Sequence, residues 1–171
     1  MDILIEQPNG KQRLFLLDRH KHIAFGGARG GGKSWAVRTK AKLLAFRYSG
    51  IRLLIVRRSY PELMNNHINI LRNELAGAAV YNDRDKILRF MNGSTINFMY
   101  CDRDGDLDRI QGVEYDVIFI DEATLAVGVP DEKHSGLRKG SKPVSKACIL
   151  HLQSRRKGTR LHKKAFCGQA L

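Results

Sequence analysis

Gly27-Ala28-Arg29-Gly30-Gly31-Gly32-Lys33-Ser34 is the stretch that decides the fold of this chain. It fits the pattern G-x-x-x-x-G-K-[S/T], in which glycines let the backbone turn tightly and point successive amide groups at phosphate oxygens. In this pattern Lys33 reaches the β- and γ-phosphates of a nucleotide, and Ser34 holds Mg²⁺. An apolar run at 23–25 predicts a strand before it, and apolar spacing over 34–48 predicts a helix after it. The alternative is a glycine-rich turn that precedes Lys-Ser by chance.

The rest of residues 1–127 predicts alternating strands and helices. Buried strands are expected at 53–56 and 117–120, and a helix over 61–75, because Pro61 suits a first helical turn. Asn92-Gly93, between alternating segments, predicts a β-hairpin. We therefore expect an α/β fold of the P-loop NTPase type, with a mostly parallel sheet flanked by helices and an inserted β-hairpin.

A carboxylate pair, Asp121-Glu122, directly follows the strand expected at 117–120. Ligands of open α/β sheets sit at the carboxyl ends of the strands, so the pair should lie beside the phosphate loop. Asp121 would bind Mg²⁺ directly or through water, and Glu122 would orient and deprotonate the attacking water. The sequence contains no guanine-reading N-K-x-D motif, which favours ATP. The alternative is a strand that ends in acidic residues by chance.

Charge divides the chain near residue 127. Residues 1–127 contain 19 Lys and Arg against 15 Asp and Glu, a net of +4, whereas residues 128–171 contain 11 against 2, a net of +9. We expect an incomplete ATPase domain over 1–127 and an irregular basic tail, poorly ordered or divergent, over 128–171. The basic excess favours nucleic acid as a partner, and a soluble protein with a solvated basic tail is the alternative.

Other classes of protein are disfavoured by what the sequence lacks. No apolar run approaches the roughly 20 residues of a membrane span, so we expect no membrane partner. Three cysteines without a C-x-x-C pair favour a reducing compartment. In the tail, the pairs Cys148/His151 and His162/Cys167 are candidate zinc ligands, but their loose spacing favours chance placement.

Four segments together resemble the N-terminal ATPase half of the large subunit of tailed-phage terminases, the motors that package viral DNA. They are Lys11-Gln12, the loop at 25–34 with its internal Arg29, the stretch LIVRRSYPEL at 54–63, and RIQGVEYD at 109–116 running into the strand and carboxylate pair. Their order and spacing span about residues 7–126 and are more specific than the phosphate loop alone.

The resemblance implies that the chain binds ATP and Mg²⁺ and couples hydrolysis to the translocation of double-stranded DNA into a capsid. Gln12 would contact adenine, or else be an exposed polar residue. Arg29 would stabilise charge on the transferring phosphoryl group, or else face solvent. Arg57 and Arg58 would contact DNA or a neighbouring subunit, or else form a solvated basic turn. The implied nucleotide-binding residues are Gln12, Gly27, Ala28, Arg29, Gly30, Gly31, Gly32, Lys33 and Ser34, and the implied catalytic residues are Lys33, Arg29 and Glu122.

The resemblance also implies a terminase small subunit and a portal protein as partners, a homo-oligomeric ring for the full-length protein, and the cytoplasm of the host cell for a phage- or prophage-encoded chain. The tail does not share the resemblance. Its only carboxylates are Asp131 and Glu132, too few for a nuclease metal cluster, so we expect a truncated chain in which the nuclease half is absent. The remaining alternatives are another P-loop DNA-dependent ATPase of the helicase kind, or a truncated, non-catalytic nucleic-acid-binding remnant.

Overall fold

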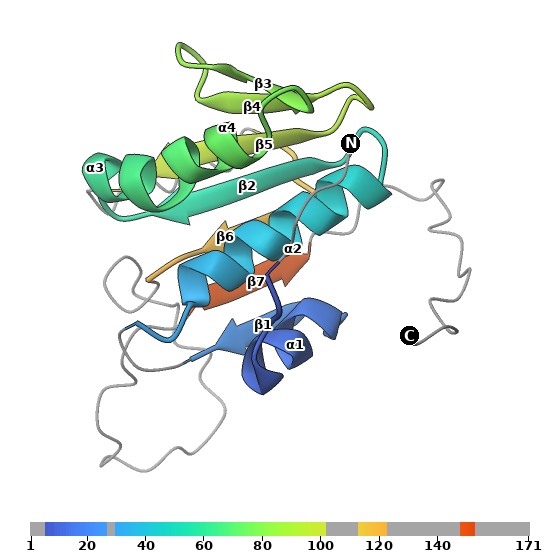
Figure 1. Cartoon of the computed structure of the whole chain (residues 1–171), viewed down its shortest axis with the longest axis vertical. Helices are drawn as coiled ribbons and strands as arrows, with labels where there is room; N and C mark the ends of the chain where they lie inside the picture. The colour runs from blue at the N-terminus through green and yellow to red at the C-terminus, as the bar shows by residue number, and fades with distance from the viewer. Residues whose placement is uncertain (1–5, 27–29, 102–112, 123–147, 153–171) are drawn as a thin grey trace.

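The structure is a computed structural model that describes residues 6–26, 30–101 and 113–122, and the backbone of 148–152. Seven strands form one sheet in the order β1-β7-β6-β2-β5-β4-β3 (Figure 1). The strands are β1 (His22–Phe25), β2 (Arg52–Arg57), β3 (Ala79–Asn82), β4 (Ile87–Phe90), β5 (Thr95–Tyr100), β6 (Val117–Ile120) and β7 (Cys148–Leu152).

The α/β class is confirmed, but the expectation of a mostly parallel sheet is wrong. Among the described strands, only β2 pairs in parallel, with β5 and with β6, and the other four pairings are antiparallel. The difference has two sources. The expected hairpin, β4–β5, is extended by β3 at one edge of the sheet, and β7 runs antiparallel between β1 and β6. Because β7 opposes both neighbours, β1 still points in the same direction as β6 and β2.

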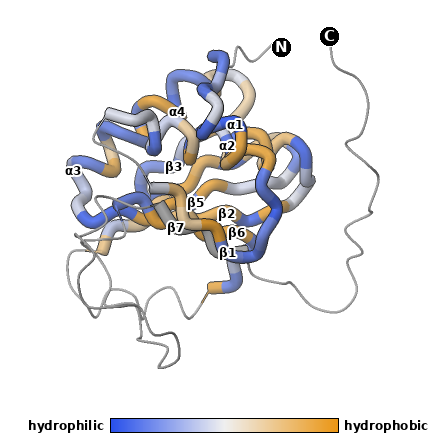
Figure 2. The backbone as a smooth tube through the Cα atoms, turned by 90° about the horizontal axis from the view of Figure 1, so that it is seen from below, coloured by the Kyte–Doolittle hydropathy of each residue, from blue (hydrophilic) through white to orange (hydrophobic). Residues whose placement is uncertain are grey.

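The helices are α1 (Gly10–Leu17), α2 (Lys33–Arg47) and a continuous helical run made of α3 (Tyr60–Leu63), the π-helical turn η1 (Met64–Ile68) and α4 (Asn69–Glu74). The helices expected over 34–48 and 61–75 are thus confirmed. All of the described helices lie on one face of the sheet (Figures 1 and 2). None of them is long and apolar enough to cross a membrane.

The core follows from the alternation of side chains along the central strand β2. Leu53 and Ile55 face the helices and pack in a cluster with Val37 and Ala41 of α2. Leu54 and Val56 point to the opposite face, where they pack in a smaller cluster with Cys101. A strand that is buried on both faces needs a continuous apolar run, which is why this segment was recognisable in the sequence.

The parallel register of β2 and β6 positions the functional residues. Val56 pairs with Ile120, and the Asp121 amide donates to the Val56 carbonyl at 2.9 Å, so Arg57 and Asp121 emerge side by side at one edge of the sheet. Since β1 points the same way, the described end of the loop before α2, residues 30–32, lies at the same edge. Strand β7 belongs to the predicted tail and occupies the space between β1 and β6, and the domain boundary near residue 127 stays a prediction.

Candidate nucleotide-binding site

The phosphate loop is described from Gly30 onward, so Gly27, Ala28 and Arg29 lie outside the described residues. Gly32 is the N-cap of α2 with a φ of 70°, the left-handed region that glycine adopts without strain. No side chain caps this helix and its first turn contains no acidic residue. The first turn of α2 therefore directs the positive end of its helix dipole towards any anion bound there.

Gln12 lies against this loop rather than in solvent. Its side chain completes a capping box with Asn9 at the start of α1, with both hydrogen bonds at 2.9 Å. Its Nε2 also donates to the Gly32 carbonyl at 3.4 Å. A Cβ on Gly32 would come within 2.3 Å of that Nε2 atom, so any other residue at this position would displace the Gln12 side chain. Contact between Gln12 and adenine stays a prediction.

The two residues expected to hold Mg²⁺ are adjacent. Ser34, at the start of α2, donates its hydroxyl to Asp121 Oδ2 at 2.7 Å, although 87 positions separate them in the chain. Asp121 is 1% exposed, and its Oδ2 also lies 2.9 Å from His67 Nε2. The edge of the sheet thus gathers a hydroxyl and a buried carboxylate at the phosphate loop, which is the pairing that the sequence predicts.

The pKa of Asp121 reflects two opposing effects. Burial alone would raise the pKa of this carboxyl group, but hydrogen bonds from His67 and Ser34 and the charge of Arg57 lower it to about 2. Burial lowers the pKa of His67, which is fully buried on η1. Asp121 is therefore an anion over the whole physiological pH range.

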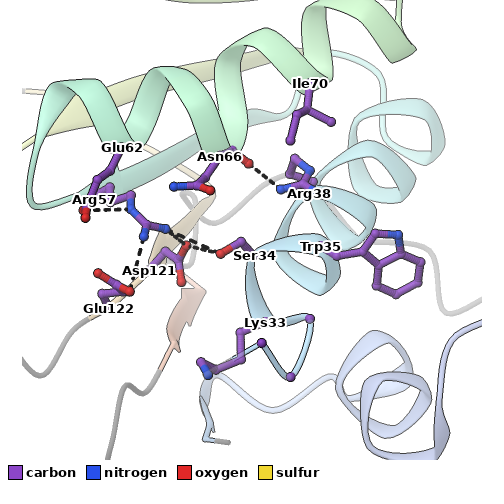
Figure 3. Close-up of a pocket in the computed structure, with 13 residues that line it drawn as sticks. Lys33, Ser34, Trp35, Arg38, Arg57, Glu62, Asn66, Ile70, Asp121 and Glu122 are labelled. Carbon is purple, nitrogen blue, oxygen red and sulfur yellow. Dashed lines mark hydrogen bonds and ion pairs between the residues drawn. The ribbon is translucent and has the colours of Figure 1, made fainter. Parts of the chain in front are cut away.

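Arg57 faces the site instead of the surface. Its side chain is 7% exposed and makes ion pairs with three carboxylates, Glu62 at 3.2 Å, Asp121 at 2.5 Å and Glu122 at 3.3 Å (Figure 3). The neighbouring Arg58 is exposed. Its burial and ion pairs direct the Arg57 side chain to the carboxylates, so it is not part of a solvated basic turn. Contact with DNA or a neighbouring subunit stays a prediction for both Arg57 and Arg58.

Glu122 has a backbone conformation that non-glycine residues rarely adopt, with a φ of 65°. Such strain concentrates at functional sites, where the surrounding structure holds it in place. Its side chain is 12% exposed and pairs with Arg57. The carboxylate that the sequence assigns to water activation is thus held beside Arg57.

A cavity of about 480 Å³ connects these residues.

One wall of this cavity was not predicted from the sequence. It is formed by the helical run from α3 to α4, which contributes Glu62, Asn66 and Ile70. Arg38 donates to the Asn66 carbonyl across this wall, and the π-helical turn directs His67 at Asp121. Single π-turns often mark functional sites, but they leave no recognisable pattern in a sequence. The lining residues are Gly30, Gly31, Gly32, Lys33, Ser34, Trp35, Arg38, Arg57, Glu62, Asn66, Ile70, Asp121 and Glu122.

The donor set suits Mg²⁺ better than a transition metal. Within the described part of the chain, no group of three or more His, Cys, Asp and Glu residues is arranged to hold a metal ion. Mg²⁺ does not need such a group, because one or two carboxylates and the phosphates of the substrate usually bind it. The Ser34 hydroxyl and the Asp121 carboxylate, 2.7 Å apart, are hard oxygen donors of this kind. The candidate zinc ligands Cys148, His151, His162 and Cys167 have side chains outside the described residues.

The described residues thus form an α/β fold in which the end of the glycine-rich loop, a helix N-terminus and a carboxylate pair lie at one edge of the sheet. A family model described as "Terminase large subunit, T4likevirus-type, N-terminal" matches residues 24–127, more than half of the chain. The chain belongs to this family, which supports a role in phage DNA packaging. Comparisons with curated proteins and with solved structures gave no match.

Proposed function

We propose that the chain is the ATP-binding and hydrolysing part of a phage DNA-packaging motor. The observation that carries this proposal is the contact of Ser34 with Asp121 at 2.7 Å, beside the N-terminus of α2 and in the same cavity as the strained Glu122. Phosphate, metal and water each then have a matching group at one edge of the sheet. Family membership indicates the process that hydrolysis would drive, which is the movement of DNA.

The roles of the residues follow from their chemistry. The backbone of the loop and the first turn of α2 would bind the phosphates, and Lys33 would neutralise their charge. Ser34 and Asp121 would hold Mg²⁺, which when bound neutralises phosphate charge. Glu122, as a carboxylate that lines the cavity, would take a proton from the attacking water. Gln12 and Arg29 would contact the adenine and the transferring phosphoryl group.

The proposed motor includes partner molecules besides this chain. We include in the proposal double-stranded DNA, a terminase small subunit, a portal protein and assembly into a ring. Each step of hydrolysis would then be coupled to DNA movement by neighbouring subunits. These partners rest on family membership alone, so the nucleotide site is the part that a single purified chain can test.

Titration with a fluorescent ATP analogue and measurement of DNA-stimulated phosphate release test the proposal. We expect the wild-type chain to bind the analogue with Mg²⁺, and Lys33→Ala to lose at least about tenfold in affinity, because a charge-assisted phosphate contact disappears. Lys21→Ala, on the exposed turn before β1, is a matched control that should bind as the wild type does. Equal binding by wild type and Lys33→Ala would contradict the assignment. Binding without any turnover would favour a non-catalytic remnant.

A further inference from the structure

Arg57 is a strongly buried cation whose partners are the proposed metal-binding and catalytic groups. Its Nη1 lies 2.5 Å from Asp121 Oδ2 and 3.5 Å from Ser34 Oγ, and its Nη2 lies 3.3 Å from Glu122. These are the same oxygens that the proposed function assigns to Mg²⁺ and to water activation. A positive group of the protein therefore already stands among them (Figure 3).

The contacts of Asp121 Oδ2 are too many for a metal ion to be added without loss. This single oxygen lies within hydrogen-bond distance of Ser34, Arg57 and His67. A carboxylate has about four lone-pair sites over its two oxygens, which is about two sites for each oxygen. Three donors on Oδ2 are therefore more than this oxygen usually accepts. Mg²⁺ also requires oxygen ligands at close to 2.0–2.1 Å, and it repels a guanidinium group at such short range.

Arg57 has a second anchor outside this cluster. Its Nε donates to Glu62 Oε2 at 3.2 Å, and Glu62 is 49% exposed in the first turn of α3. The end of the guanidinium can leave Asp121 while its Nε keeps the bond to Glu62. The side chain therefore has a defined second partner towards the rim of the cavity.

We propose that Arg57 acts as a built-in cation that competes with Mg²⁺ for Ser34, Asp121 and Glu122, and that metal entry moves its guanidinium towards Glu62. This inference rests on the proposed function, because it concerns the regulation of the same site. Without metal, Arg57 neutralises the charge of the carboxylates. Mg²⁺ replaces Arg57 productively only when the additional phosphate charge of a nucleotide favours the exchange.

Mn²⁺ titration of the full chain without nucleotide, followed by electron paramagnetic resonance of free Mn²⁺, tests the competition. We expect Arg57→Gln to bind Mn²⁺ at least about tenfold more tightly than the wild type, because the carboxylates lose their competing cation. Arg58→Gln makes the same change in net charge at an exposed position, and it should stay within about twofold of the wild type. Equal affinities of Arg57→Gln and Arg58→Gln, or weaker binding by Arg57→Gln, would overturn the proposal.

Thermal unfolding with and without Mn²⁺ covers the case in which Arg57→Gln folds poorly. Buried carboxylates without a counter-charge destabilise a fold, so the variant should melt below the wild type without metal. Added Mn²⁺ should raise its melting temperature by more than it raises that of the wild type. No larger rise in the variant would overturn the proposal.

Nucleotide binding by the wild type separates this inference from the proposed function. A wild-type chain that fails to bind the ATP analogue contradicts the proposed function, whatever the Mn²⁺ affinities are. A wild-type chain that binds the analogue, together with an Arg57→Gln variant whose Mn²⁺ affinity is unchanged, contradicts the competition alone.

Discussion

At the scale of single residues, the site depends on two carboxylates that are neighbours in the chain but differ in environment. Asp121 is buried and receives bonds from Ser34 and His67, whereas Glu122 turns towards the cavity in a strained backbone conformation. Adjacent carboxylates with separate environments can take separate roles, one in binding the metal and one in handling a proton. The next two predictions test this division.

Glu122→Gln should keep nucleotide binding and lose turnover. The amide retains the size of the side chain but cannot accept the proton of the attacking water, so we expect the rate of hydrolysis to fall at least about a hundredfold. Asp121→Asn is the comparison, and it should also weaken Mg²⁺-dependent binding of the nucleotide. Parallel binding titrations and phosphate-release assays measure both effects. Hydrolysis by Glu122→Gln at the wild-type rate would show that another group activates the water.

The pKa of Asp121 predicts a loss of stability in acid. Its folded-state pKa of about 2 lies below the ordinary value of 3.8, so the ionised carboxylate stabilises the fold above pH 3.8 and this contribution disappears as the pH falls towards 2. We expect about 2 kcal/mol of the free energy of unfolding to be lost over this interval. Urea unfolding at a series of pH values measures it.

Two variants complete that measurement. Asp121→Asn lacks the titrating group, so its free energy of unfolding should lack this part of the acid-induced fall. Asp85→Asn, at an exposed turn between β3 and β4, should keep the wild-type pH dependence. An acid-induced fall of the same size in Asp121→Asn would assign the effect to other groups.

At the scale of the elements, the sequence was informative where an element is either fully buried or closed by a specific turn. The runs at 53–56 and 117–120 became β2 and β6, and Asn92-Gly93 became the turn between β4 and β5. It was uninformative for α1, a short helix that depends on a capping box and on Lys40, whose Nζ donates to two carbonyls at the end of α1, each at 2.7 Å. The same is true of β7, because its antiparallel insertion depends on pairing over a long distance along the chain.

The candidate site divides in the same way. The sequence predicted the approach of Ser34 to Asp121, because parallel strands place their carboxyl ends at one edge. It could not predict that Arg57 is buried and Arg58 is exposed. The register between β2 and β6 determines which of the two faces Asp121. It also could not predict His67, because a π-turn changes the helical period within five residues and a lone histidine in a helix carries no signal.

Strand β7 offers a test at the same scale. The backbone of Leu150 pairs with Phe119 of β6 and with Ile23 of β1, so it lies in the interior of the sheet. Leu150→Pro should lower the free energy of unfolding by about 2 kcal/mol or more, because proline removes a ladder hydrogen bond and leaves a buried acceptor unpaired. Leu150→Val keeps the backbone donor and removes one methylene group, so it should cost about 1 kcal/mol. Equal stability of the two variants would contradict a place for β7 in the sheet.

At the scale of the whole molecule, the basic excess and the nucleotide site belong to different parts of the chain. The site is built from residues between Gln12 and Glu122, whereas residues 153–171 contain six Lys and Arg and no Asp or Glu. Because β7 ends at Leu152, a chain shortened after that residue keeps every described strand. Nucleotide binding and DNA binding, both still predictions, can therefore be tested separately without removing a described strand from the sheet.

A chain that ends at Leu152 should keep its affinity for nucleotide and lose most of its salt-sensitive affinity for DNA. Each phosphate that Lys or Arg neutralises contributes about −0.9 to the slope of log affinity against log salt, so six fewer basic residues should reduce the slope by up to about 5. Fluorescence anisotropy with duplex DNA across a salt series measures it. A full-length chain in which these six residues (Arg155, Arg156, Lys157, Arg160, Lys163 and Lys164) are replaced by Gln should behave as the shortened chain does, because the effect depends on charge. Equal DNA affinity with and without residues 153–171 would refute the assignment and move the DNA contact to the body of the domain, where Arg58 is exposed beside α3.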